Sequence, residues 1–187
     1  MRVLLAVPGP RPPQGPARGL PHRVTTEESC LWWVGVHGGA GESTWARLLP
    51  GSRAAGHAWP VPATPHLAPN RVVLVARTDL RGLLAVQAAA AQWVEQHRGT
   101  VDLLGLVLSA DAPGRLPRPL ADLAGHVSGG VPRVWRVPWL PAWRMYLPDE
   151  ADVPGNGAVH RVLQEVVHLI PPRPSDPSSP HVPGGEG

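Results

Sequence analysis

Lysine is absent from this chain of 187 residues, so its 17 basic residues are all arginine. Any chemical step that requires a lysine amine is therefore excluded. Phenylalanine is also absent, and Ile170 is the only isoleucine, whereas alanine, glycine, proline and arginine are abundant. This bias is typical of a GC-rich coding sequence, and it reflects the genome more than a mechanism.

Cysteine and long apolar runs are scarce as well. Cys30 is the only cysteine, which excludes a disulfide within the chain and favours a reduced, cytoplasmic setting. The opening MRVLLAVPGP has a short apolar run that proline ends, too short for a signal-peptide core. No stretch approaches the roughly 18 apolar residues that span a bilayer, so we expect no membrane association. The nine histidines show no metal-ligand spacing, and no nucleophile motif is present.

Proline and glycine divide the chain into a compact part and two tails. Residues 1–28 are expected to be a Pro/Gly-rich N-terminal tail, with residues 8–23 extended or disordered. Residues 171–187 are expected to be a disordered C-terminal tail for the same reason. The domain between them, residues 29–170, has enough apolar residues to form a buried core.

Apolar runs alternate with helical patterns through this domain. Four runs predict buried strands: Leu31–Val36, Arg71–Ala76, Leu103–Leu108 and Arg133–Val137. The segments between and after them predict four helices: Ser43–Leu49, Asp79–His97, Pro119–Val127 and Val159–Leu169. A further short strand around Trp59 and Val61 is expected between prolines. Strands that alternate with helices predict a three-layer α/β fold whose parallel sheet has four or five strands.

A glycine-rich loop follows the first of these strands and precedes a helix. It contains His37 and then the candidate nucleotide- or anion-binding residues Gly38, Gly39, Ala40, Gly41, Glu42, Ser43 and Thr44. Glycines allow close approach of the backbone to an anion, and the free amides of a helix N-terminus point toward it. The motif resembles the deviant phosphate loop of the ParA/MinD partition and positioning ATPases, which reads lysine-Gly-Gly-x-Gly-lysine-Ser/Thr-Thr. The resemblance implies a phosphate-loop NTPase fold with fewer elements than usual, and ATP or GTP with magnesium as ligands.

This chain departs from that family at both lysines. His37 stands at the signature lysine, and Glu42 stands at the lysine that holds phosphate. Residues 50–70 also contain no acidic residue, although the family has strands that end in aspartate there. We therefore expect no catalysis, and Ser43 and Asp111 are only weak candidates for magnesium ligands. Asp111 has the alternative interpretation of a residue that caps the turn DAPG.

Trp135, Trp139 and Trp143 are spaced by four residues and alternate with arginines. They are either anchors of a surface for a protein partner or large residues that fill the core in place of phenylalanine. Strings such as ADAPGRLPRPL, GGVPRVWR and AWR also resemble an uncharacterised family of GC-rich bacteria that is often encoded on integrative and plasmid elements.

These observations lead to one main hypothesis and two alternatives. The main one is a non-catalytic, ParA/MinD-like binding or accessory protein of a bacterial mobile element. The first alternative is a weak nucleotide-binding protein or ATPase/GTPase that uses the GGAGEST loop, with Arg47 or a partner's residue in place of lysine. The second is a nucleic-acid-binding accessory protein driven by arginine, because the formal net charge is +3 even though the arginines are scattered.

Overall fold

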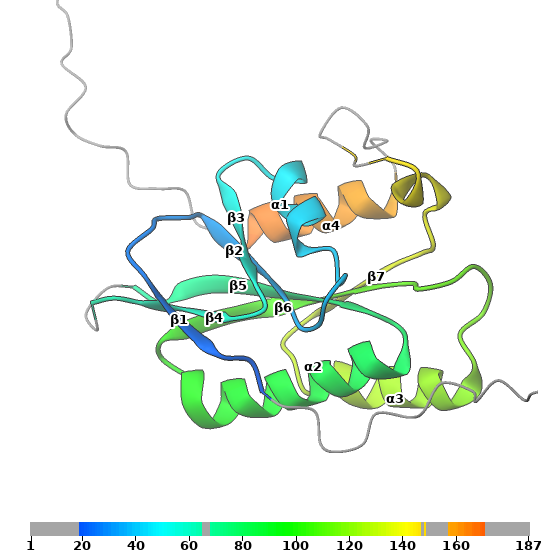
Figure 1. Ribbon diagram of the computed structural model, residues 1–187, viewed down its shortest axis with the longest axis horizontal. Coiled ribbons are helices and arrows are strands. Elements are labelled where there is room, and N and C mark those ends of the chain that lie inside the picture. The colour runs from blue at the N-terminus through cyan, green and yellow to red at the C-terminus, as the bar shows by residue number, and fades with distance from the viewer. Residues whose placement is uncertain (1–18, 65–67, 147, 149–156, 171–187) are drawn as a thin grey trace, which may run out of the picture.

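The computed structural model describes residues 19–64, 68–146, 148 and 157–170. Its centre is a five-stranded sheet in the order β3-β2-β5-β6-β7, and every neighbouring pair in it is parallel. Helices lie on both faces of this sheet, which gives the domain three layers (Figure 1). The predicted α/β fold with a parallel sheet and flanking helices is confirmed. The expected tail over residues 171–187 lies outside the described residues.

Four strands coincide with the continuous apolar runs of the sequence to within two residues. They are β2 (Leu31–Gly35), β5 (Asn70–Arg77), β6 (Val101–Ser109) and β7 (Val134–Val137). The fifth strand, β3 (Ser52–Gly56), is an edge strand that pairs only with β2. Its sequence SRAAG is neither apolar nor rich in β-branched residues, so its strand conformation follows from pairing with β2 rather than from local preference.

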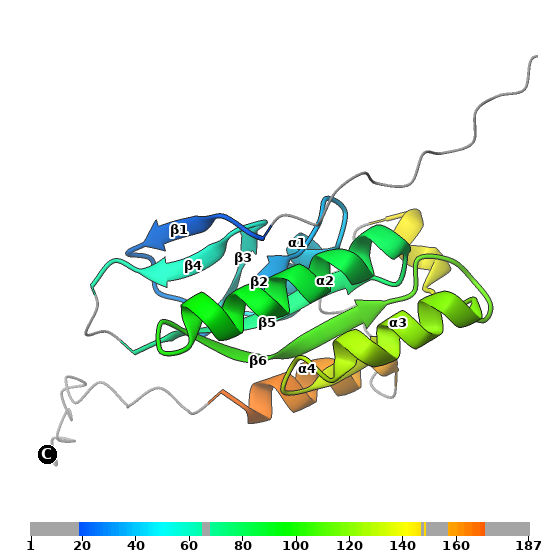
Figure 2. The same cartoon turned by 90° about the horizontal axis from the view of Figure 1, so that it is seen from below.

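The helices form two layers. In one layer lie α1 (Glu42–Leu48) and α4 (Ala158–His168), and in the other lie α2 (Leu80–Gln92) and α3 (Arg118–Ser128), as Figures 1 and 2 show. The helix predicted to reach His97 ends at Gln92 and continues as a π-helical turn, η1 (Trp93–His97). A 3₁₀ turn, η2 (Pro141–Arg144), follows β7. None of the helices in the described part of the chain is long and apolar enough to cross a membrane.

Two adjacent tryptophans of β2 are buried on opposite faces of the sheet. Trp32 is buried with residues of α2 and α3, whereas Trp33 is buried with residues of α1 and α4. Trp33 stacks on Trp45 of α1, with 5.3 Å between ring centroids. Successive side chains of a strand point to opposite faces, so this pair requires that both faces of β2 be covered.

A second, two-stranded parallel sheet joins β1 (His22–Thr25) to β4 (Trp59–Pro62). The short strand expected at Trp59 is therefore present. The strand β1 lies within the segment expected to be tail, and Leu20 before it is buried. Pairing with β4 and packing on the α2 side of the core provide the contacts that the sequence of this segment does not indicate by itself.

One glutamine of α2 fixes this N-terminal segment. The Gln92 side chain accepts a hydrogen bond from the Leu20 N–H at 2.7 Å and donates one to the Leu20 carbonyl at 2.8 Å. Its oxygen also accepts from Trp59 Nε1 at 2.9 Å. The amide thus satisfies both backbone groups of a buried residue and the indole of a fully buried one.

Replacement of Gln92 by alanine should therefore destabilise the two-stranded sheet of β1 and β4 more than the rest of the domain. We expect the free energy of unfolding to fall by about 2 kcal/mol, because three partners lose their hydrogen bonds in a partly buried place. Hydrogen exchange should accelerate selectively in residues 20–25 and 59–62. Gln87→Ala, at an exposed glutamine of the same helix, is the matched control. Equal effects of the two variants would contradict this role of Gln92.

His97 lies beneath the same small sheet. It is buried, contacts the rings of His22 and Trp59, and its Nε2 has no hydrogen-bond partner among the described residues. Burial lowers the pKa of His97 below its ordinary value of 6.5, and the nearby His22 lowers this pKa further. The unfolded chain therefore takes up a proton at this residue more readily than the folded chain does.

Acid should consequently destabilise the fold through His97. The stabilising effect of the neutral ring is complete above pH 6.5 and declines as the pH falls from 6.5 toward the lower folded-state pKa. His97→Gln should flatten this decline between pH 7.5 and 5.5, measured by chemical denaturation. His126→Gln, at an exposed histidine of α3, should leave it unchanged. If the free energy of unfolding of His97→Gln still declines in this pH range as it does in the wild type, other titrating groups cause the decline.

Candidate functional site

The glycine loop lies where the order of strands in the sheet reverses direction. From β2 the chain passes through α1 to β3 on one side, whereas β5, β6 and β7 follow on the other side. The helices after β2 and β5 leave toward opposite faces of the sheet (Figure 1). In open α/β sheets, this arrangement leaves a crevice at the carboxyl ends of the two strands, and ligands bind there.

The loop itself has several backbone amides without internal partners. Gly41, with a φ of 106°, is the N-cap of α1, and its carbonyl accepts hydrogen bonds from the N–H groups of Thr44 and Trp45. Among the described residues, no partner is recorded for the N–H groups of Gly38, Gly39, Glu42 and Ser43. The predicted site residues thus do form a strand–loop–helix unit. That they bind an anion or a nucleotide stays a prediction.

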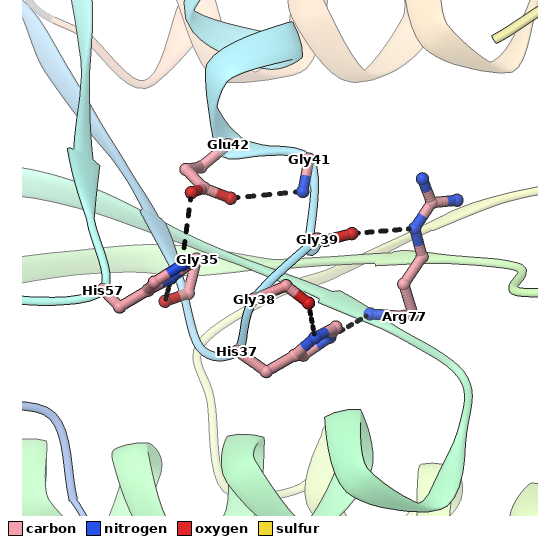
Figure 3. A network of polar contacts seen from close by, with 8 residues as sticks. All are labelled: Gly35, His37, Gly38, Gly39, Gly41, Glu42, His57 and Arg77. Carbon is pink, nitrogen blue, oxygen red and sulfur yellow. Dashed lines mark hydrogen bonds and ion pairs between the residues drawn. The ribbon is translucent and has the colours of Figure 1, made fainter. Parts of the chain in front are cut away.

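Glu42 folds its carboxylate back against the loop instead of extending into solvent. Its Oε2 accepts a hydrogen bond from the Gly41 N–H at 3.2 Å, and the residue is buried, with 8% of its surface exposed. The carboxylate lies directly over Gly35 at the end of β2, as Figure 3 shows. One amide of the loop is therefore already occupied by an anion that belongs to the protein.

His57, just after β3, faces the same carboxylate. Its Nδ1–H donates to the Gly35 carbonyl at 2.9 Å, which directs Nε2 toward Glu42 Oε1 at 3.8 Å (Figure 3). This separation is too long for a hydrogen bond but suits an ion pair when the ring is protonated. No sequence pattern indicates His57, because the strand β3 that precedes it has no apolar signal.

His37 connects the ends of β2 and β5. Its Nε2 accepts a hydrogen bond from the Arg77 N–H at 3.0 Å, and its Nδ1–H donates to the Gly38 carbonyl at 3.0 Å. Both bonds are made by the neutral ring with its proton on Nδ1. Gly82 in the first turn of α2 leaves room for the ring, since a Cβ there would lie 3.0 Å from His37 Nε2. The imidazole therefore fills part of the crevice.

Arg77 is the cation that contacts the loop. Its Nε lies 3.5 Å from the Gly39 carbonyl, and its Nη1 donates to the Ala110 carbonyl at 3.2 Å. Arg47, the predicted substitute for lysine, lies in the last turn of α1 and is exposed. The sequence pattern points to position 77, because this residue directly follows the predicted buried strand Arg71–Ala76, where the carboxyl end of a parallel strand is expected.

The two weak candidates for metal ligands are not brought together by any recorded contact. Ser43 is exposed at the start of α1. Asp111 Oδ1 accepts a hydrogen bond from the Thr78 hydroxyl at 2.8 Å, and the Asp111 N–H donates to Thr78 Oγ1 at 3.3 Å. Asp111 thus ties the ends of β5 and β6 together. Among the described residues, no group of three or more His, Cys, Asp or Glu side chains could hold a metal ion.

The three tryptophans of the predicted partner surface have different environments. Trp135 is buried, and its Nε1–H donates to Glu165 Oε2 of α4 at 2.7 Å. Trp143 is half-buried and packs against Trp45, with 5.8 Å between ring centroids. Trp139 is half-buried beneath the Arg144 guanidinium, 5.4 Å from its ring centroid. The core interpretation therefore applies to Trp135, while Trp139 and Trp143 border the surface.

Two adjoining pockets open at the carboxyl edge of the sheet, beside the loop. The larger, of about 480 Å³, lies between the ends of β5, β6 and β7 and the start of α3; Leu108, Leu120 and Val137 are among its walls. The smaller, of about 240 Å³, is lined by Arg77, Asp111, Trp139, Leu140, Trp143 and Arg144. Asp111 belongs to both pockets, so their walls are continuous.

Comparison with known proteins identifies a family without a known activity. The model of a family of unknown function, DUF6668, matches residues 29–157. The chain belongs to DUF6668. No curated protein matches this member of DUF6668, and no solved structure matches it.

The position of the Glu42 carboxylate can be tested without any ligand. Gly35→Ala should lower the free energy of unfolding by about 1–3 kcal/mol, because the new methyl group would meet this carboxylate and lie 2.9 Å from His57 Nδ1. In a Glu42→Ala background, the same substitution should cost about 1 kcal/mol less. Chemical denaturation of the four proteins measures both costs.

Gly38→Ala is the control within the same loop, since a Cβ there meets nothing within 4 Å. It should have a small effect that does not depend on residue 42. If Gly35→Ala costs the same in both backgrounds, the carboxylate does not lie over β2.

Proposed function

We propose that this protein is a degenerate, ParA/MinD-like phosphate-loop protein that works by binding and does not hydrolyse nucleotides. The observation that carries the proposal is the buried Glu42 carboxylate, which accepts the Gly41 N–H within the loop. The resemblance to a family encoded on integrative and plasmid elements is the reason to place this binding function in a mobile element.

Charge is the first argument against a working hydrolase. A phosphate at the loop would face the carboxylate at position 42, where the ParA/MinD ATPases that the motif resembles have an attractive lysine. At about 4 Å, repulsion between two unit charges costs roughly 1 kcal/mol in water and about 4 kcal/mol at an effective dielectric constant of 20. No lysine elsewhere in the chain can compensate.

The local structure supplies a second argument. Helix α1 has only seven residues and no side-chain cap, so its N-terminus contributes a small field. Arg77 already has two carbonyl partners, at Gly39 and Ala110, and serves to hold the loop against β6. The crevice between β2 and β5 is partly filled by His37, which is hydrogen-bonded to the Arg77 N–H of β5 and to the Gly38 carbonyl of the loop. These contacts stabilise a closed loop without a ligand.

The experiment is a measurement of ATP turnover and ATP binding in the presence of magnesium. The wild-type protein should show no detectable turnover. Glu42→Ala should tighten ATP binding by removing the repulsion, and Glu42→Lys should tighten it further, by roughly ten- to hundredfold over wild type, by adding an attraction. Isothermal titration with a non-hydrolysable ATP analogue gives these affinities.

Two further variants test whether the change in ATP affinity depends on the charge at position 42. Glu95→Lys introduces the same charge change at an exposed residue of η1 and should leave the affinity unchanged. Glu42→Gln keeps an acceptor for the Gly41 N–H and should resemble Glu42→Ala. If the wild-type protein hydrolyses ATP and Glu42→Lys abolishes that activity, the loop is a working site of another design, and the proposal fails.

A further inference from the structure

The two pockets at the carboxyl edge carry an excess of positive charge that no described contact neutralises. Arg77 and Arg144 line the smaller pocket, and Arg115 and Arg136 line the larger one. Asp111 is the only acidic residue among the described residues that line them. The walls between these charges are apolar, formed by residues such as Leu108, Leu120 and Val137.

We propose that these two pockets together bind a short peptide of a partner protein, with an acidic side chain between Arg77 and Arg144 and a neighbouring large apolar side chain in the larger pocket. The proposal rests on the binding function given above and names the class of partner. The planar guanidinium group of Arg144, whose contact among the described residues is with the Trp139 ring, can donate two parallel hydrogen bonds to a carboxylate. Arg77, whose Nε and Nη1 are bonded to carbonyls, adds its positive charge. The larger pocket lies within the range of sizes, roughly 300–1,000 Å³, that ligand sites occupy.

Asp111 favours a peptide over a phosphate ligand. One of its oxygens is occupied by the Thr78 hydroxyl, and its carboxylate still has acceptor capacity toward the pockets. A peptide brings N–H donors for such an acceptor together with its single carboxylate charge. A phosphate group brings only acceptors and close to two negative charges, so Asp111 repels it more strongly.

The tryptophans argue against single-stranded nucleic acid as the occupant. Binding of single strands depends on aromatic rings whose faces are open for bases to stack. Here Arg144 covers Trp139, Trp143 packs against Trp45, and Trp135 is buried. These rings act as walls and supports, which suits an interface in which a few arginine and aromatic residues anchor a partner.

The test is a selection from a random dodecapeptide display library on the immobilised full-length protein. The wild-type chain should enrich peptides that combine Asp or Glu with a neighbouring Leu, Ile, Phe or Trp. The affinity of a fluorescein-labelled copy of the most enriched peptide is then measured by anisotropy. Arg144→Gln should weaken it by about tenfold or more, because a charged hydrogen bond is lost.

Arg161→Gln, at an exposed arginine of α4, is the matched control and should change the affinity less than about twofold. Circular dichroism shows whether both variants are folded. The proposal is overturned if no such peptides are enriched, or if Arg144→Gln binds them as well as the wild type does. It is also overturned if a labelled dT12 oligonucleotide binds, competes with the peptide and is lost in Arg144→Gln. ATP turnover is measured separately, so a failure of the proposed non-catalytic function is recognised independently.

Discussion

The packing of β2 on both of its faces is the constraint on which the domain depends. Trp32 and Trp33 are consecutive and almost completely buried, so their side chains must enter opposite layers of the core. Neither layer can be removed without exposing an indole ring to water. The central place of β2 also fixes where its loop emerges, between the ends of β3 and β5. The packing of the core and the position of the candidate site thus both follow from the central place of β2.

The candidate site is a polar network in which several side chains are bonded to the loop or to a neighbouring strand end. Glu42 is held by Gly41, His37 by Arg77, and Asp111 by Thr78. Glycine loops that lead into a helix can bind anions through their free backbone amides. Here Glu42 occupies one of these amides, and the His37 ring fills part of the crevice. The residues with remaining capacity lie further along the sheet edge, at the two pockets lined by arginine.

The central sheet could be predicted because its strands β2, β5, β6 and β7 are continuous apolar runs, which parallel strands require. The edge strand β3 and the strand β1 could not, since SRAAG and HRVT owe their conformation to partners distant in sequence. The same applies to the site. The loop was visible as a motif, but the contacts of Glu42 with His57 and of His37 with Arg77 join residues 15 and 40 positions apart. No local pattern encodes such contacts, and only the order of strands in the sheet brings them together.

The close approach of α2 to the end of β5 has a consequence for variation within the family. A side chain at position 82 would collide with the Arg77 carbonyl and press on the His37 ring. The Arg77 carbonyl is the nearer of the two obstacles and belongs to the backbone, so a smaller residue at position 37 would not by itself make room for a side chain at position 82. We expect glycine to be kept at position 82 among relatives even where position 37 varies. In a relative with a smaller residue at position 37, the crevice between β2 and β5 would be emptied of its imidazole and open to a ligand.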